Sequence, residues 1–200
     1  MKQENTYWPF KIDEVCTYSY LEDFLTPQEC DEIIKIGRDT GLNQGLVGTD
    51  SNSSKGRKDK KIRDSKITWL FPNEKTSWLY RKLTDSVTSL NNQFFNFDIN
   101  GFAEGLQFTY YKAPSGHYGK HVDRSLNLVN RKISIVIQLS DESKYKGGEL
   151  SLYEDSKPYI FPKKKGTLCL FPSYVLHEVT PVTKGERYSL VAWITGPNFK

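Results

Sequence analysis

The second half of the chain has the two-residue periodicity of β-strands, and this feature constrains the fold more than any other. From Phe102 onward, seven short runs rich in β-branched and aromatic residues are separated by turn signals. These runs are GLQFTYY, KHVD, RKISIVIQLSD, GGELSLY, GTLCLF, HEVTPV and RYSLVAWI. The third run alternates, which predicts one buried face formed by Ile133, Ile135, Ile137 and Leu139.

An amphipathic helix is predicted before the strands, in TPQECDEIIKIGRDTG. Thr26 can cap this helix, Pro27 suits its first position, and Glu29 completes a capping box. Gly41 can end it. Its apolar face has the spacing i, i+3, i+4, i+7 and consists of Cys30, Ile33, Ile34 and Gly37. We expect this face to pack on a sheet.

A second helix is predicted over residues 74–92, where the apolar residues recur with helical period. These residues are Leu79, Leu83, Val87 and Leu90. Helices followed by closely spaced short strands are typical of an α+β domain whose β part is a sandwich or jelly roll. A chain of 200 residues is expected to form one such domain.

Composition argues against several classes of protein. The aromatic content of 14% argues against disorder, and a net charge of +4 is too small to imply nucleic-acid binding. No run approaches the roughly 20 apolar residues of a membrane span, and the N-terminus lacks the apolar segment of a signal peptide. Cys16, Cys30 and Cys169 are odd in number and lack metal-type spacing. We therefore expect a cytoplasmic protein with no membrane partner.

The basic surplus is concentrated in SSKGRKDKKIRDSK, from Ser53 to Lys66. Polar and basic residues with a glycine and no apolar period predict a solvated surface loop. A lid over a binding site, or a docking site for an acidic partner, is the alternative.

The stretch SGHYGKHVDRS holds two of the three histidines of the chain. If KHVD is a strand, His121 and Asp123 leave the same face, and Val122 points into the opposite layer. His177 is the expected third ligand, because His117 lies in a predicted loop. Two histidines and one carboxylate are typical of non-heme Fe(II) oxygenases, whereas zinc prefers a closed tetrahedral shell or three ligands and a water. The donor set therefore favours iron.

Arg187 follows His177 by ten residues and shares a strand face with Ser189. An arginine on an apolar strand is costly without an anionic partner, and its planar fork suits a carboxylate. A dicarboxylate cosubstrate would supply this partner. The alternative is an ion pair with a nearby glutamate, namely Glu149, Glu178 or Glu186.

The segment from Tyr111 to Trp193 presents a fixed series of motifs. In order they are Tyr111, Gly116, Tyr118, HVD, IQLSD, GGEL, GTLCLFPS, HEVTPV and GERYS. This series resembles the 2-oxoglutarate- and Fe(II)-dependent oxygenases of the prolyl 4-hydroxylase-like branch. YLEDFLTPQECDEII and KIRDSKITWL are also similar to that family, so the likeness covers nearly the whole chain. The family tyrosine usually stands nine residues before the first metal histidine, which leaves both Tyr110 and Tyr111 as its counterpart.

The resemblance implies a double-stranded β-helix, or jelly roll, with the N-terminal helices packed on one sheet. It implies a single domain over residues 1–200, with a helical part over 1–100 and a jelly-roll core over 102–196. The metal site would lie at the mouth of this core.

The resemblance also implies the roles of six residues. The catalytic ligands of Fe(II) would be His121, Asp123 and His177. Arg187 would bind the distal carboxylate of 2-oxoglutarate, with hydrogen bonds from Tyr111 and Ser189. Asn127 and Arg131 are weaker candidates for facing the substrate.

The implied reaction consumes O₂ and 2-oxoglutarate, with ascorbate as a candidate reductant. It would hydroxylate an amino-acid side chain, first of all a prolyl residue in a peptide or protein, with lysine, a free amino acid or a small molecule as alternatives. Two other functions stay open, oxidative demethylation of nucleic acid and a non-catalytic jelly-roll binding module. Demethylases usually carry a second arginine shortly after the first, which YSLVAW lacks, and a binding module has no use for three iron-type ligands.

Overall fold

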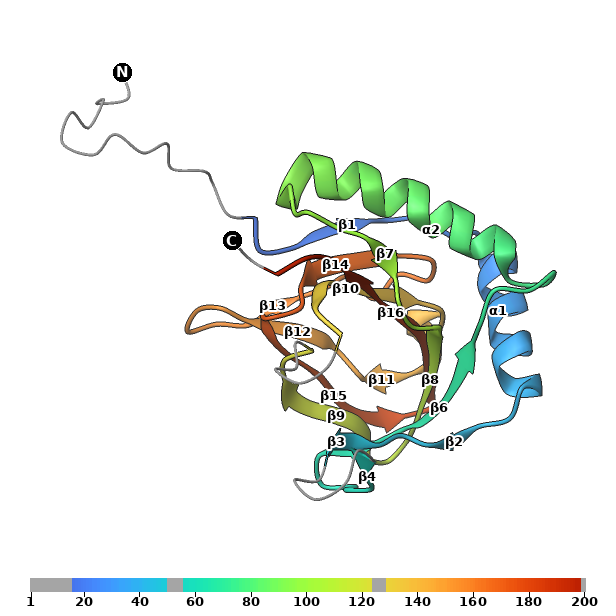
Figure 1. Cartoon of the computed structure of the whole chain (residues 1–200). Helices are drawn as coiled ribbons and strands as arrows, with labels where there is room; N and C mark the ends of the chain where they lie inside the picture. Colours follow the sequence, from blue (N-terminus) through green and yellow to red (C-terminus); the bar gives the residue numbers. More distant parts are fainter. Residues whose placement is uncertain (1–15, 50–55, 124–128, 199–200) are drawn as a thin grey trace.

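The structure is a computed structural model that describes residues 16–49, 56–123 and 129–198. It consists mainly of antiparallel sheet, with two helices on the outer side of the larger sheet (Figure 1). The larger sheet runs, in spatial order, β1 (Ser19–Leu21), β14 (Leu168–Pro172), β10 (Arg131–Gln138), β16 (Glu186–Thr195), β8 (Leu106–Lys112), β6 (Lys66–Leu70) and β2 (Asn43–Gln44). β7 (Gly101–Phe102) pairs with the end of β16.

The smaller sheet faces the larger one. Its strands are, in spatial order, β13 (Tyr159–Ile160), β12 (Leu150–Tyr153), β15 (Leu176–Lys184), β9 (Gly116–His121) and β5 (Arg63–Asp64). β11 (Lys146–Gly147) pairs with β15, and β3 (Val47–Thr49) forms a separate hairpin with β4 (Gly56–Arg57). Each predicted β-rich run thus supplies a strand, but β9 begins four residues before the predicted KHVD and ends at His121, so Val122 and Asp123 lie outside it.

Helix α1 (Pro27–Asp39) forms as the sequence predicts. The Glu29 N–H donates to Thr26 Oγ1 at 3.2 Å, and the Thr26 N–H donates to a Glu29 carboxylate oxygen at 2.7 Å, which confirms the capping box. The predicted face packs on the larger sheet. A side chain at Gly37 would collide with Phe108 of β8, since an added Cβ would lie 2.4 Å from its ring.

Helix α2 (Ser77–Leu90) continues into a π-helical turn (Asn91–Phe95). It begins three residues later than predicted because Thr76 closes a turn, accepting from the Asn73 N–H and donating to the Phe71 carbonyl. The predicted apolar stripe is buried at three of its four positions, Leu79, Leu83 and Val87.

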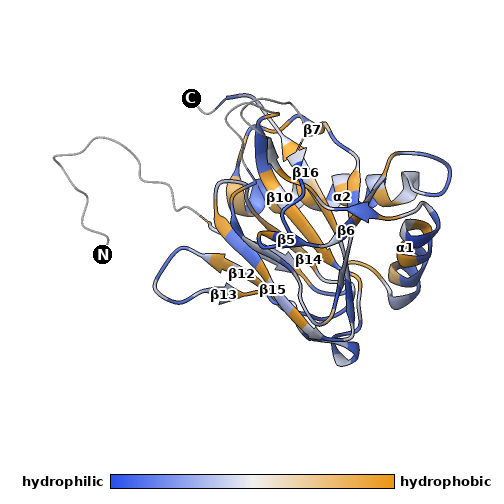
Figure 2. Cartoon of the chain, turned by 90° about the horizontal axis from the view of Figure 1, so that it is seen from below, coloured by the Kyte–Doolittle hydropathy of each residue, from blue (hydrophilic) through white to orange (hydrophobic). Residues whose placement is uncertain are grey.

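Two apolar clusters fill the interior. The larger lies between the helices and the larger sheet and includes the predicted face of β10, Ile133, Ile135, Ile137 and Leu139. The smaller lies between the two sheets and includes Val136 and Phe171. Figure 2 shows hydrophobic colour along β10 and β16 and alternating hydrophobic and hydrophilic residues on α1. Both faces of β10 are therefore buried, one against helices and one against the other sheet.

The prediction of a solvated loop from Ser53 to Lys66 is wrong for its second part. Residues 53–55 lie outside the described part of the chain, but 56–66 contain β4, β5 and the first residue of β6. Arg63 is only 6% exposed, because β5 pairs with β9 and carries this side chain inward. Lys58, Lys60 and Lys61 are exposed, as a solvated segment requires.

No helix within residues 16–49, 56–123 and 129–198 is both long enough and apolar enough to cross a membrane. Cys16, Cys30 and Cys169 are free thiols, and the last two are buried.

Candidate metal centre and its pocket

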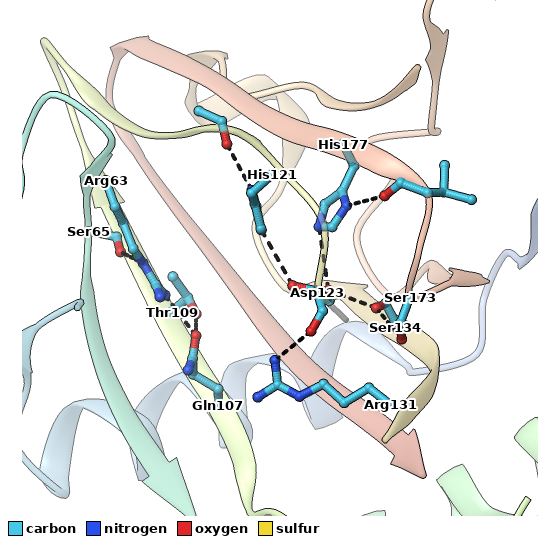
Figure 3. A network of polar contacts seen from close by, with 12 residues as sticks. Arg63, Ser65, Gln107, Thr109, His121, Asp123, Arg131, Ser134, Ser173 and His177 are labelled. Carbon is cyan, nitrogen blue, oxygen red and sulfur yellow. Dashed lines mark hydrogen bonds and ion pairs between the residues drawn. The ribbon is translucent and has the colours of Figure 1, made fainter. Parts of the chain in front are cut away.

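The three predicted ligands converge between the two sheets. His121 ends β9, and His177 lies opposite it in the register of β15, with ring centroids 4.2 Å apart. The Asp123 carboxylate lies 3.4 Å from the Nε2 atom of each ring, through Oδ1 to His121 and through Oδ2 to His177. One ligand atom from each residue lies within 4.8 Å of the other two, and Figure 3 shows both rings directed at the carboxylate. The predicted convergence is confirmed.

The local geometry differs from the predicted one. β9 ends at His121, so Asp123 lies in the bend that follows and its N–H donates to the Ser173 carbonyl at 3.0 Å. Val122 is 47% exposed instead of pointing into the opposite layer. The bend therefore directs the carboxylate at both rings, in place of the predicted strand periodicity.

Backbone carbonyls fix the tautomer of both rings. The Nδ1 atom of His121 lies 2.8 Å from the Gly119 carbonyl, and that of His177 lies 2.9 Å from the Val175 carbonyl. A carbonyl only accepts, so each Nδ1 carries the proton, and the Nε2 of a neutral ring keeps its lone pair. Two imidazole nitrogens and one carboxylate thus face a common point, and this donor set fits a divalent metal with further coordination positions open.

Asp123 is held as a carboxylate. Burial alone would raise its pKa, but the neighbouring His177 and His121 rings hold the pKa well below its usual range. The Ser134 hydroxyl donates to Oδ2 at 2.7 Å and lies 2.9 Å from the Ser173 hydroxyl. Burial would lower the pKa of His177, yet the neighbouring Asp123 raises it overall.

His117 takes no part in this cluster. It lies on β9 instead of in the predicted loop, and its Nδ1 and Nε2 atoms contact the carbonyls of Ser115 at 2.7 Å and Lys61 at 3.1 Å. The predicted loop position is therefore wrong, although His117 is not part of the donor cluster.

A cavity of about 300 Å³ opens beside the three side chains and is lined by residues of both sheets. Tyr118 forms one wall, as predicted, with its ring stacked on His121 at a centroid distance of 3.6 Å. Arg131 also lines the cavity, while Asn127 lies outside the described residues. The cavity is large enough for small ligands beside the donor cluster.

Arg187 is fully buried on β16, behind the cavity. Its Nη2 donates to Gln138 Oε1 at 2.9 Å and its Nη1 to Ser189 Oγ at 3.4 Å, while its Nε has no hydrogen-bond partner within the described residues. Among the described residues, the Tyr145 hydroxyl is also buried without a hydrogen-bond partner, and Gly148 packs against both side chains. Unpartnered buried donors around a guanidinium fit a carboxylate-bearing ligand.

The alternative of a structural ion pair for Arg187 is wrong. Within the described residues, no carboxylate lies within 4.0 Å of its guanidinium, and the three glutamates considered have other partners. Glu149 contacts Thr180 and Lys163. Glu178 accepts from Tyr153, and Glu186 accepts from Tyr110 and Tyr188.

The structure separates the two candidate tyrosines. Tyr111 is 2% exposed, lines the cavity, and its ring lies 5.2 Å from the Arg187 guanidinium carbon. Tyr110 points to the other face of β8 and donates to Glu186 at 2.6 Å. Ser189 lines the cavity on the same face of β16 as Arg187. Tyr111 and Ser189 therefore both line the cavity on the side of Arg187.

Several residues of the site were not found from the sequence. Gln138 interrupts the apolar run of β10, and this interruption is a signal that could have identified it as a partner of Arg187. Tyr145, Gln107 and Trp193 carry no such signal, because single polar or aromatic residues next to turns and in strands are common.

Comparison with known proteins agrees with this geometry. Residues 106–195 match the family model of the 2OG-Fe(II) oxygenase superfamily. A PKHD-type hydroxylase of Nitrosomonas europaea is 27% identical over 183 residues, which cover 87% of this chain and 76% of the relative. Alignments with further PKHD-type hydroxylases cover between 36% and 57% of the length of those proteins.

Two solved structures have the same fold. A prolyl-4-hydroxylase of Pseudomonas putida has a TM-score of 0.71 at 23% identity, over 92% of this chain and 94% of that one. A prolyl hydroxylase of Trichoplax adhaerens, in complex with a hypoxia inducible factor peptide fragment, has a TM-score of 0.73 at 20% identity, over 90% and 83%. Residues 106–195 are thus similar to the 2OG-Fe(II) oxygenase superfamily, and the fold of the chain is that of the two solved structures.

Proposed function

We propose that this protein is a 2-oxoglutarate- and Fe(II)-dependent oxygenase that hydroxylates an amino-acid side chain. The observation that carries the proposal is the convergence of His121, Asp123 and His177 beside a cavity. Behind it lies the buried cation Arg187, which has no carboxylate partner among the described residues. A prolyl residue in a peptide or protein is the first candidate substrate, since solved prolyl hydroxylases share the fold and one of them holds a peptide. A free amino acid is the alternative.

The fold proposed for this activity is the double-stranded β-helix. Its support is the repeated passage of the chain between the two sheets, with β8, β10, β14 and β16 in the larger and β9, β12, β13 and β15 in the smaller. We infer one domain over residues 1–200. The core over 102–196 is covered by the part over 1–100, which contributes both helices and also β1, β2 and β6 to the larger sheet.

In the proposed mechanism, the two Nε2 atoms and the Asp123 carboxylate hold the metal. Bound Fe(II) supplies the coupling of O₂ reduction to the oxidation of 2-oxoglutarate and of the substrate C–H bond. Ser134 orients the carboxylate of Asp123, and the backbone carbonyls keep each imidazole nitrogen available to the metal.

The remaining residues position the organic ligands. Arg187 pairs with the distal carboxylate of 2-oxoglutarate, assisted by Tyr111 and Ser189, while Gln138 holds the guanidinium in place. Tyr118 packs against His121 and excludes water from one side of the metal.

The test compares two histidine variants. Wild-type protein with Fe(II), ascorbate and 2-oxoglutarate is expected to bind both ligands and release succinate, faster when a substrate is present. His177→Ala removes a proposed ligand and is expected to lose iron binding and succinate release. His117→Ala is the matched control and is expected to keep both, because its ring contacts only backbone carbonyls outside the cluster.

Two outcomes contradict the proposal. One is a wild-type protein that binds neither Fe(II) nor 2-oxoglutarate. The other is a folded His177→Ala variant, checked by circular dichroism, that retains the iron affinity and succinate release of His117→Ala.

A further inference from the structure

Two arginines, Arg63 and Arg131, line the cavity without a role in the proposed mechanism. Arg63 on β5 lines the cavity and is 6% exposed. It donates to three neutral acceptors, Ser65 Oγ at 2.8 Å, Gln107 Oε1 at 2.7 Å and the Leu46 carbonyl at 3.3 Å. A guanidinium has five N–H groups, so one on each terminal nitrogen has no acceptor in the described part of the chain.

Arg131, the other arginine that lines the cavity, has a carboxylate partner, and Arg63 has none within the described residues. Glu104 binds the Arg131 guanidinium through both carboxylate oxygens, at 2.6 and 2.7 Å. No carboxylate lies within 4.0 Å of Arg63 in the part of the chain that the structure describes. A buried charge without a counterion is unfavourable, and the contact with the Tyr118 ring at 4.5 Å offsets only part of that cost.

Further donors face the same space. Gln107 Oε1 accepts from Arg63, and the NH₂ of Gln107 has no hydrogen-bond partner within the described residues. The indole N–H of Trp193, which also lines the cavity, is buried and has no partner within the described residues. Arg63, Gln107 and Trp193 thus offer hydrogen-bond donors, and a ligand that satisfies them must be rich in acceptors.

The position of Arg63 relates this group of donors to the metal centre. One face of the Tyr118 ring is covered by His121, so the Arg63 guanidinium contacts the other face. Figure 3 shows Arg63 and Gln107 on one side of the space and Asp123 with both histidines on the other. A molecule in this space can contact the donors and present a carbon to the metal at the same time.

We propose that Arg63 binds a carboxylate of the prime substrate, with Gln107 as a second donor. The proposal rests on the function proposed above and narrows its substrate class to acidic molecules. The carboxylate must lie close in covalent structure to the carbon that is hydroxylated. It belongs either to an aspartate or glutamate next to the target residue or to the α-carboxylate of the target itself.

The experiment uses matched pairs that differ in this one group. One pair is acetyl-Ala-Ala-Pro-Glu-Ala-amide and its Gln counterpart, and a second is acetyl-Ala-Ala-Pro as free acid and as amide. A third is free proline and prolinamide, and each pair is repeated with lysine in place of proline. Succinate release above the substrate-free rate gives kcat and KM for each compound, and the pair that discriminates identifies the source of the carboxylate.

Three variants complete the design. Arg63→Gln is expected to raise KM for the preferred acid at least tenfold and to abolish the preference over its amide. Arg63→Lys keeps the charge without the planar fork and is expected to retain part of the preference. Lys61→Gln removes an equal charge from an exposed position two residues away and is expected to keep the full preference.

The possible results distinguish a failure of the Arg63 assignment from a failure of the proposed oxygenase function. If no acid stimulates the wild type, or if amides serve equally well, the assignment of Arg63 is wrong, and substrate-free succinate release still supports the oxygenase. If Arg63→Gln instead lowers the affinity for 2-oxoglutarate tenfold, the carboxylate at Arg63 belongs to the cosubstrate, which also overturns the proposal. Retained iron affinity shows in each variant that the site is folded.

Discussion

The two faces of the larger sheet are built from the same strands and have opposite chemistry. On the face toward α1 and α2, residues such as Phe108, Ile135 and Leu190 pack in a continuous apolar layer. On the face toward the smaller sheet, the alternate positions of β8, β10 and β16 carry buried polar groups. These are Gln107, Thr109, Ser134, Gln138, Arg187 and Ser189.

The difference indicates that the outer face contributes mainly to stability and the inner face mainly to ligand binding. The outer layer satisfies its packing internally and needs no ligand. Among the described residues, the inner face leaves Arg187 Nε and the indole N–H of Trp193 without hydrogen-bond partners and the Arg187 guanidinium without a carboxylate. Such groups are unfavourable in a protein interior, so their presence indicates ligands that complete them.

The largest effect is expected from Asp123→Ala on the inner face. Loss of a residue that merely orients a ligand costs about 10–100-fold in metal affinity or activity, so loss of a proposed ligand is expected to exceed about 100-fold. Isothermal titration with Fe(II) and succinate release measure the effect, with the far-ultraviolet circular dichroism unchanged. Iron affinity within threefold of the wild type would sink the proposed ligand role.

On the outer face, Leu83→Ala tests stability without touching the cavity. Leu83 is fully buried between α2 and the sheet, so its truncation is expected to lower the free energy of unfolding by about 2–5 kcal/mol. Ser89→Ala, at an exposed position on the same helix, is the control and should change it by less than about 0.5 kcal/mol. Urea denaturation measures both. An altered 2-oxoglutarate affinity in folded Leu83→Ala would show that the two faces are coupled.

Arg187→Ala addresses the inner face again, with a smaller effect. We expect the affinity for 2-oxoglutarate to fall at least about tenfold, or 1.4 kcal/mol, with iron binding retained. Removal of an uncompensated buried cation is not expected to destabilise the apo-protein by a comparable amount. Arg81→Ala, at an exposed position on α2, is the charge-matched control. Equal loss of iron and cosubstrate binding would mean that Arg187 supports the fold.

The sequence was more informative for the outer face than for the inner one. Helical and strand periodicity located α1, α2 and the buried stripe of β10, because apolar burial repeats locally along the chain. The pairing of His121 with His177 depends on the register of β9 and β15, which no local pattern encodes. The sequence analysis places Arg63 in a solvated loop because the segment around it is rich in lysine, and composition does not distinguish one buried arginine from its exposed neighbours.

The smallest effect is expected at the edge of the outer layer, where Glu29 caps α1 and lies 2.8 Å from Lys82 of α2. Burial would raise the pKa of Glu29, but Lys82 and the Thr26 N–H outweigh it and lower the pKa overall. The stabilisation is therefore complete above the unfolded pKa of about 4.3 and is lost as the pH falls through the folded value.

Glu29→Gln keeps an acceptor for the cap and removes the charge, so we expect it to lower the free energy of unfolding by about 0.5 kcal/mol at pH 7. The difference from the wild type should shrink toward zero below pH 4, in urea titrations at each pH. Glu32→Gln, an exposed acid on the same helix, corrects for the change in net charge. If the difference in free energy of unfolding persisted unchanged at acid pH, the effect would come from packing at the α1–α2 contact instead of from the charge of the carboxylate. The outer layer would then be stabilised by apolar packing alone, even at its edge.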